Sequence, residues 1–159
     1  MLKMKRIISL LIVVILAFSM FSCVSNDEER AKNLVYKTTI LNKRDLRDAK
    51  LTHIYEDKGW DGSLYYYVFA VEDGFASNLE NYLTSLPLSE EARGFYEKSS
   101  VLNGESVADI PDIENGYYYY LNDSDASDER VYLVVFDASS GILYYFAATG
   151  QAVRFPRKY

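Results

Sequence analysis

The chain has 159 residues, of which 49% are hydrophobic and 25% charged, and its net charge is −6. This apolar share excludes disorder for most of the chain, because disordered chains lack the side chains that offset the cost of ordering the backbone. A single histidine and a single cysteine exclude a zinc site of Cys and His ligands and a disulfide framework, which need several such residues. The length fits one domain of about 130 residues.

The N-terminus has a basic segment followed by an apolar one. Three basic residues within positions 3–6 precede an uncharged apolar stretch over residues 7–21. This order is typical of a secretory signal peptide. The only cysteine of the chain, Cys23, follows directly after the small residue Ser22.

The sequence Met20, Phe21, Ser22, Cys23 resembles the lipobox of bacterial lipoproteins. In that family a signal peptidase cuts before the cysteine, whose sulfur carries a diacylglycerol and whose new amine is usually acylated. The family more often has leucine and a small residue where Met20 and Phe21 stand. The resemblance covers the first 23 residues and implies a signal peptide over residues 1–22 and lipid attachment at Cys23.

Two alternatives to a cleaved lipoprotein remain open for this segment. Residues 7–26 form an uncharged stretch of 20 residues, which as an uncleaved anchor could span a hydrocarbon core of about 30 Å. Ordinary secretion with Cys23 as a free thiol is the other alternative. The lipoprotein and the anchor both predict an extracytoplasmic, membrane-tethered chain in the bacterial cell envelope, on the inner or the outer membrane.

The charge of the remaining chain limits its partners. Without the three basic residues of the signal peptide, the net charge falls from −6 to −9. This charge argues against nucleic-acid binding, which depends on Lys and Arg neutralising phosphates. It also opposes flat binding of the whole domain to anionic lipid, so we expect the lipid tether to hold the protein at the membrane.

The pattern after Cys23 predicts one α+β domain over residues 33–159, preceded by a lipidated cysteine and a flexible stalk over residues 23–32. Residues 33–41 have the composition of a first strand. Two β-rich segments, residues 51–56 and 64–71, flank a glycine-containing turn and predict an antiparallel hairpin.

The period then changes to that of helices. Apolar residues three and four apart predict a helix over residues 75–86, and Ser89 can cap a second helix that ends near Ser100. Three further strands follow over residues 116–121, 130–136 and 142–148, as a meander. The predicted fold is an antiparallel sheet of four to six strands, packed on one face by the helical hairpin.

The most distinctive feature is the abundance of tyrosine, with 15 in the chain, several in runs within predicted strands. Successive strand residues point to opposite faces, so each run places tyrosine on both faces of the sheet. One interpretation is structural, an aromatic ladder between strands. The other is a binding platform for a glycan or a peptide. Its candidate residues are Trp60, at the tip of the hairpin, and Tyr66, Tyr118, Tyr120 and Tyr145.

Other patterns point to no defined chemistry. The acidic segment from Asp123 to Glu129 lacks the glycine and glutamate positions of an EF-hand, and a solvated loop is the default interpretation. His53 is the only histidine and belongs to no nucleophile motif. We therefore assign no catalytic residue, metal ligand or cofactor. The leading hypothesis is a non-catalytic binding or scaffold module of the envelope; the alternatives are a carboxylate-based hydrolase and an inhibitor or immunity-type partner of another protein.

Overall fold

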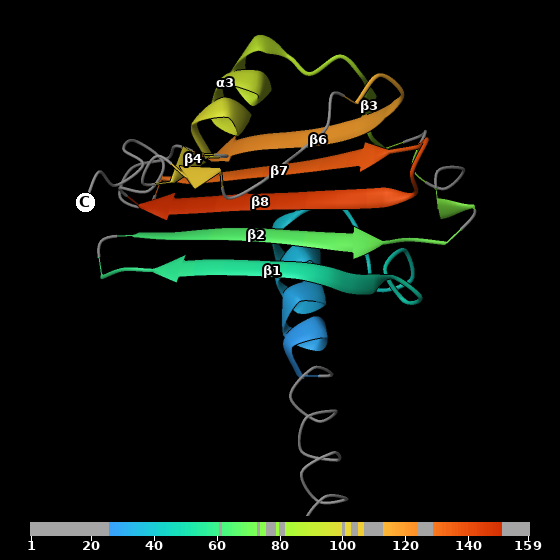
Figure 1. The fold of residues 1–159 in the computed structure, drawn as a ribbon, viewed down its shortest axis with the longest axis horizontal. Helices are drawn as coiled ribbons and strands as arrows, with labels where there is room; N and C mark the ends of the chain where they lie inside the picture. Colours follow the sequence, from blue (N-terminus) through green and yellow to red (C-terminus); the bar gives the residue numbers. More distant parts are fainter. Residues whose placement is uncertain are drawn as a thin grey trace, which may run out of the picture.

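A computed structural model of the protein describes residues 26–60, 62–72, 74–75, 79, 82–99, 101–102, 105–106, 113–123 and 129–150. The predicted signal peptide, Cys23 and the C-terminal residues 151–159 lie outside the described residues. The predicted α+β class is confirmed, with one six-stranded antiparallel sheet and helices packed on it (Figure 1). No helix in the described part of the chain is long and apolar enough to cross a membrane.

The order of strands in the sheet is β1-β2-β8-β7-β6-β3. A hairpin of β1 and β2 joins a meander of β6, β7 and β8, because β2 pairs with β8 over their full length. The element bounds are β1 Lys50–Lys58, β2 Gly62–Ala70, β3 Thr84–Ser85, α3 Glu90–Ser99, β6 Gly116–Asp123, β7 Arg130–Asp137 and β8 Ile142–Gly150. A separate two-stranded ribbon consists of β4 Val101–Leu102 and β5 Glu105–Ser106.

The five long strands are those that the alternating and apolar patterns predicted, and their ends differ from the predicted ends by at most two residues. The turn between β7 and β8 is built as expected around a glycine with positive φ, Gly141. The buried Asp137 carboxylate fixes this turn, since it accepts hydrogen bonds from the Ser139 backbone N–H (2.8 Å) and the Ser140 hydroxyl (2.6 Å).

Residues 26–38 form a helix, so the flexible stalk predicted over residues 23–32 is wrong from residue 26 on, and the strand predicted over residues 33–41 is wrong. Ala31 and Val35, four residues apart, are fully buried and pack this N-terminal helix onto the sheet. A half-buried salt bridge from Lys32 to Glu28 (2.8 Å), one helical turn apart, supports it. Residues 33–38 are helical despite their strand-like composition, because burial of one apolar face of the helix outweighs a weak intrinsic preference for strands.

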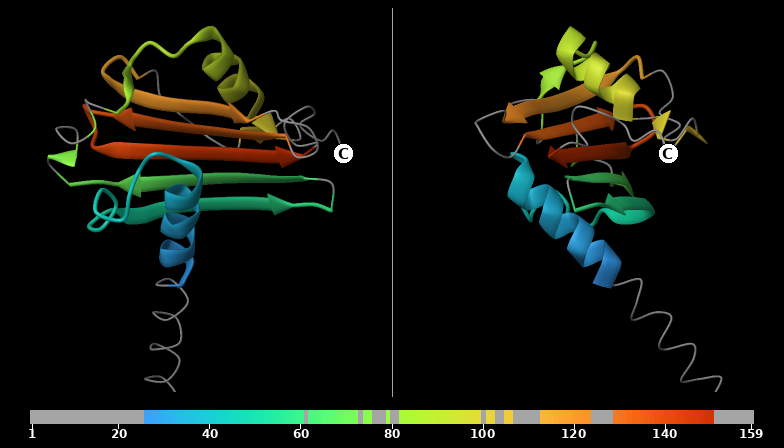
Figure 2. Two further views of the ribbon diagram at one scale, coloured as in Figure 1. Left: turned by 180° about the vertical axis from the view of Figure 1, so that it is seen from behind. Right: turned by 90° about the vertical axis from the view of Figure 1, so that its left-hand side faces the viewer.

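The second predicted helix is present as α3, and Ser89 caps it through a hydrogen bond from the Ala92 backbone N–H to the Ser89 hydroxyl (3.2 Å). The preceding predicted helix is only partly formed, because Thr84 and Ser85 form β3 and pair with β6. The expected helical hairpin on one face is therefore replaced by α3 on one face and the N-terminal helix on the other (Figure 2).

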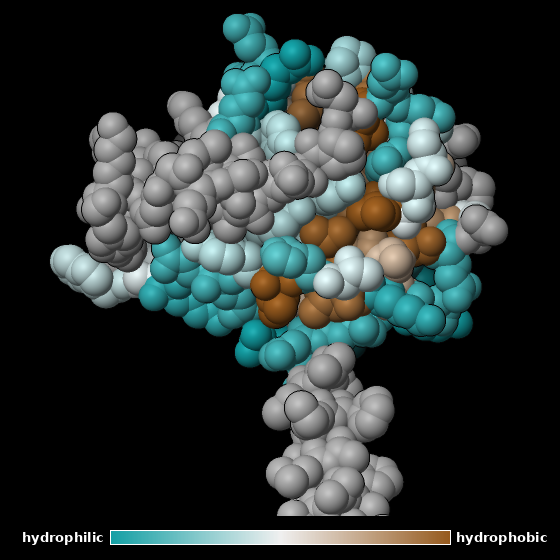
Figure 3. Space-filling model, viewed as in Figure 1, coloured by the Kyte–Doolittle hydropathy of each residue, from teal (hydrophilic) through white to brown (hydrophobic). Residues whose placement is uncertain are grey.

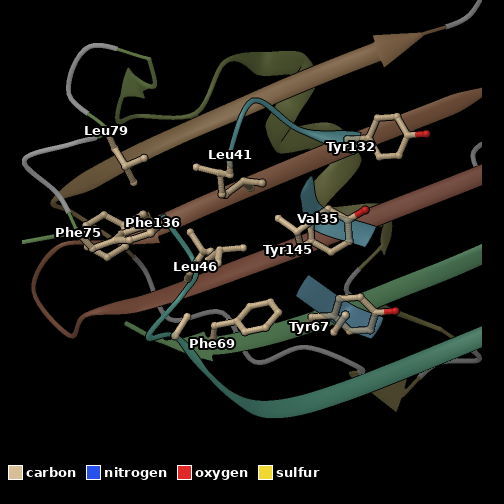
Figure 4. Close-up of a cluster of buried hydrophobic side chains, with 14 of the residues drawn as sticks. Val35, Leu41, Leu46, Tyr67, Phe69, Phe75, Leu79, Tyr132, Phe136 and Tyr145 are labelled. Atoms are coloured by element: carbon tan, nitrogen blue, oxygen red, sulfur yellow. The ribbon is translucent and has the colours of Figure 1, made fainter. Parts of the chain in front are cut away.

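Both faces of the sheet consequently carry a hydrophobic core. The core under the N-terminal helix includes Tyr67 and Tyr145 and extends to Leu46 in the loop that leads into β1 (Figure 4). The core on the opposite face includes Phe146 and receives Phe95 from α3. On that face apolar side chains gather near the centre and hydrophilic residues surround them (Figure 3).

Candidate functional site

An open pocket of about 500 Å³ lies between the N-terminal helix and the β1–β2 hairpin. We call it the helix–sheet groove. One wall is a single face of the helix, whose residues follow a spacing of three to four, and the other wall consists of alternate residues of β1 and β2. Its lining residues are Asn26, Glu29, Arg30, Asn33, Leu34, Lys37, Glu56, Lys58, Tyr65 and Tyr67.

Glu56 is the centre of the polar contacts in the groove. One carboxylate oxygen, Oε1, accepts hydrogen bonds from the Tyr67 hydroxyl (2.6 Å) and from Nη2 of Arg30 (3.1 Å). The other, Oε2, forms a salt bridge with Nζ of Lys58 (2.5 Å). The contact with Arg30 joins the N-terminal helix to β1, so this cluster links the two walls of the groove.

Burial by itself would raise the pKa of Glu56, since the side chain is only 13% exposed. Hydrogen bonds from Lys58 and Tyr67 and the charge of Arg30 outweigh burial, and the pKa of the carboxyl lies below its ordinary value. Glu56 is therefore ionised at neutral pH and is a hydrogen-bond acceptor. This is the opposite of the raised pKa that a carboxylic general acid needs.

The tyrosines beneath the groove are held in their neutral form. Burial and the adjacent Glu56 carboxylate raise the pKa of Tyr67, and burial raises the pKa of Tyr145. The two rings stack with centroids 5.6 Å apart, and their hydroxyls point the same way along the strands (Figure 4). The Tyr145 hydroxyl is hydrogen-bonded to the Thr38 hydroxyl (2.8 Å), a second link between sheet and helix.

Tyr65 is the half-buried aromatic residue of the groove. Its ring lies 6.3 Å from that of Tyr67, and Nζ of Lys58 is 5.6 Å from its centroid. Together with the amides of Asn26 and Asn33 on the helix, the groove offers ring surface, neutral hydrogen-bonding groups and charges of both signs. Such a mixture is suited to binding a polar ligand with a flat apolar side.

The predicted site residues are distributed differently from the expected exposed platform. Tyr66, Tyr118 and Tyr145 are 5%, 9% and 0% exposed, because both sheet faces are covered. Tyr120 is half-buried beside Phe95 of α3. Only Trp60 is fully accessible, at 98% exposure, on the turn between β1 and β2. The structure therefore brings the five residues together neither on one face nor at one surface.

Sequence reasoning missed the helix–sheet groove because one of its walls is the unpredicted helix. A signal for the other wall was present, since Tyr65 and Tyr67 alternate in one strand, and Glu56 and Lys58 in its hairpin partner. These four residues must share one face of the hairpin.

Metal binding and catalysis find little support in the described part of the chain. Among the residues described, there is no group of three His, Cys, Asp or Glu side chains that could hold a metal ion. The acidic segment after Asp123 lies outside them over residues 124–128. His53 is exposed on β1 and packs against the Tyr66 ring, with centroids 5.4 Å apart. The groove does contain two carboxylates, Glu29 and Glu56, but Glu56 is held in the ionised form by its three donors.

No known protein family, curated protein or solved structure matches this chain.

Proposed function

We propose that this protein is a membrane-tethered lipoprotein of the bacterial cell envelope that acts as a non-catalytic binding module. The tether is inferred from the basic and apolar N-terminal segments and from the position of the sole cysteine, Cys23, directly after them. The ligand site is inferred to be the helix–sheet groove.

The observation that carries the binding proposal is the composition of this groove. Its size lies within the range of about 300–1,000 Å³ that is usual for small-ligand sites. Tyr65 supplies a ring on which the C–H face of a sugar can lie. The amides of Asn26 and Asn33 can each donate to and accept from hydroxyl groups. Because charged and amide groups outnumber apolar ones, we favour a glycan of the envelope over an apolar ligand.

A non-catalytic role is favoured over hydrolysis by the state of Glu56. Three donors occupy its carboxylate, and its pKa lies below the ordinary value because those donors outweigh the effect of burial. In a carboxylate-pair hydrolase one acid stays protonated to donate a proton, and the other is an ionised nucleophile or base that needs an accessible oxygen. Glu56 is ionised, but donors occupy both of its oxygens. Glu56 instead accepts the hydrogen bond of the buried Tyr67 hydroxyl and links the two walls of the groove.

Calorimetric titration with soluble disaccharide-peptides released from peptidoglycan tests this proposal. We expect saturable binding that Tyr65→Ala weakens about tenfold, which corresponds to about 1.4 kcal/mol. Tyr82→Ala is the matched control, because Tyr82 is a tyrosine 69% exposed outside the groove, and it should bind as the wild type does. The proposal is overturned if no heat is released, or if the two variants behave alike.

A further inference from the structure

We infer that the β1 side of the domain is a bilayer-contact surface, which rests on anionic phospholipid at two places along the edge of the sheet. One place is Trp60, beyond the end of β1. The other is the basic segment, residues 43–50, which leads into its start. This inference rests on the proposed lipoprotein function and adds an orientation of the domain on its membrane.

The described chain starts on this side of the molecule. The N-terminal helix projects past β1, the edge strand of the sheet, in both views that show it from the front and from behind (Figures 1 and 2). Glu28 accepts a hydrogen bond from the Leu51 backbone N–H (3.2 Å), which fixes this end of the helix at β1. Two residues lie between Cys23 and Asn26, so a lipid on Cys23 would hold the start of the helix within about 11 Å of its attachment point.

Trp60 is placed to enter the interface of a bilayer. It lies in the tight turn after β1, closed by a hydrogen bond from the Gly59 backbone N–H to the Gly62 carbonyl (2.8 Å). With 98% of its surface exposed, the indole packs on little of the folded chain. Tryptophan is enriched at the headgroup level of membranes, where its ring is buried and its N–H stays hydrated.

The basic segment lies at the opposite end of β1. It contains four exposed cations, none of which forms a salt bridge with a residue that the structure describes: Lys43, Arg44, Arg47 and Lys50. Asp45, within the segment, accepts a hydrogen bond from the Asn42 backbone N–H (2.8 Å). The Arg47 carbonyl accepts one from Lys32 of the N-terminal helix (3.3 Å). The cations are therefore held beside the helix by which the chain would leave for the membrane.

Charge is distributed along the chain so as to orient the domain. Residues 26–50 carry seven basic and five acidic side chains, a net charge of +2. Residues 51–159 carry seven basic and 18 acidic side chains, a net charge of −11. An anionic surface attracts the first group and repels the second, over a distance of about 8–10 Å at physiological ionic strength.

A weak contact suffices for this role. Because a tether converts surface binding into an intramolecular event, the effective concentration is of the order of millimolar. The nine residues of β1 span about 27 Å, so Trp60 and the basic segment form two separated contacts that resist rotation.

Trp60 is the only tryptophan of the chain, so its fluorescence tests the inference directly. The full-length protein is purified from membranes, its acylation is checked by intact mass, and it is reconstituted into vesicles of phosphatidylcholine with or without phosphatidylglycerol. With phosphatidylglycerol, we expect Trp60 emission at shorter wavelength and several-fold weaker quenching by acrylamide. Salt at 1 M should reverse both effects, because the screening length falls to about 3 Å.

Matched single variants separate this surface from general electrostatics. Arg44→Gln should reduce the phosphatidylglycerol effect, and replacement of all four cations of the basic segment by glutamine should abolish it. Arg93→Gln removes an exposed cation of α3 and should leave the effect unchanged. Acylated protein whose Trp60 is quenched equally in both vesicles overturns the orientation and leaves the lipoprotein proposal standing. An unacylated mass overturns the tether itself, together with the orientation that depends on it.

Discussion

The hydrogen bond between Tyr67 and Glu56 makes a quantitative prediction about stability. Tyr67 is 1% exposed and donates at 2.6 Å to an ionised carboxylate. A hydrogen bond to a charged group contributes about 1.5–3 kcal/mol, so Tyr67→Phe should lower the free energy of unfolding by about 2 kcal/mol. Glu56→Leu should lower the free energy of unfolding by a similar amount, but for a different reason.

In Glu56→Leu the loss of the two ion pairs costs little free energy, because Arg30 and Lys58 are 54% and 52% exposed and water can solvate them. The main cost is the buried Tyr67 hydroxyl, left without an acceptor, at about 1–3 kcal/mol. The double variant has no hydroxyl to leave unpaired. We therefore expect it to be about as stable as either single variant, which gives a coupling energy of about 2 kcal/mol.

Urea denaturation of the purified protein and its variants measures this coupling. Tyr65→Phe is the control, because Tyr65 lies on the same strand and face but forms no hydrogen bond with Glu56. Its effect should add to that of Glu56→Leu within about 0.5 kcal/mol. If the effects of Tyr67→Phe and Glu56→Leu on the free energy of unfolding also added within about 0.5 kcal/mol, the two residues would not be coupled by this hydrogen bond.

Four further outcomes follow from the described contacts. Gly116→Ala should destabilise by about 3 kcal/mol or more in urea denaturation, because its Cβ would lie 1.9 Å from the Phe136 carbonyl oxygen and neither backbone can yield cheaply. Ser89→Ala should cost about 1 kcal/mol through loss of the cap of α3, as measured by thermal unfolding. Leu46→Ala, which removes a fully buried side chain, should cost about 2–5 kcal/mol, and an unchanged unfolding midpoint would contradict the packing of this loop. The pKa of Glu56 is lower in the folded state than its ordinary value of 4.5. Its contribution to the free energy of unfolding is therefore present above pH 4.5 and lost as the pH falls through the lowered pKa. Below about pH 4.5, the free energy of unfolding of Glu56→Leu should depend less on pH than that of the wild type.

The strands could be predicted because their local signals and their burial agree. Residues 130–136 are almost entirely apolar and form the buried central strand β7, and residues 64–71 form β2 with a shift of one or two residues at each end. The meander and hairpin followed from turn residues such as Gly141, whose positive φ suits a tight connection.

The N-terminal helix could not be predicted because its local preference and its tertiary environment disagree. Residues 33–41 are rich in β-branched and aromatic side chains, yet burial of Ala31 and Val35 against the sheet decides the structure. The hydroxyl of Thr38, a residue that favours strands, instead donates to the Leu34 carbonyl near the end of the helix (2.8 Å).

This one difference changes the candidate site. A second covered face buries Tyr145 and removes the expected platform of exposed tyrosines. It also creates the helix–sheet groove, whose second wall is the helix itself. Trp60 retains the accessibility that the sequence indicated, but at a distance from the buried tyrosines along the sheet.

The intact mass of the protein extracted from bacterial membranes tests directly whether this chain is a lipid-tethered envelope protein. We expect a polypeptide that begins at Cys23 and carries the added mass of a diacylglycerol on the sulfur, with a further acyl chain on the amine. A polypeptide that begins at Met1 with an unmodified thiol would contradict it.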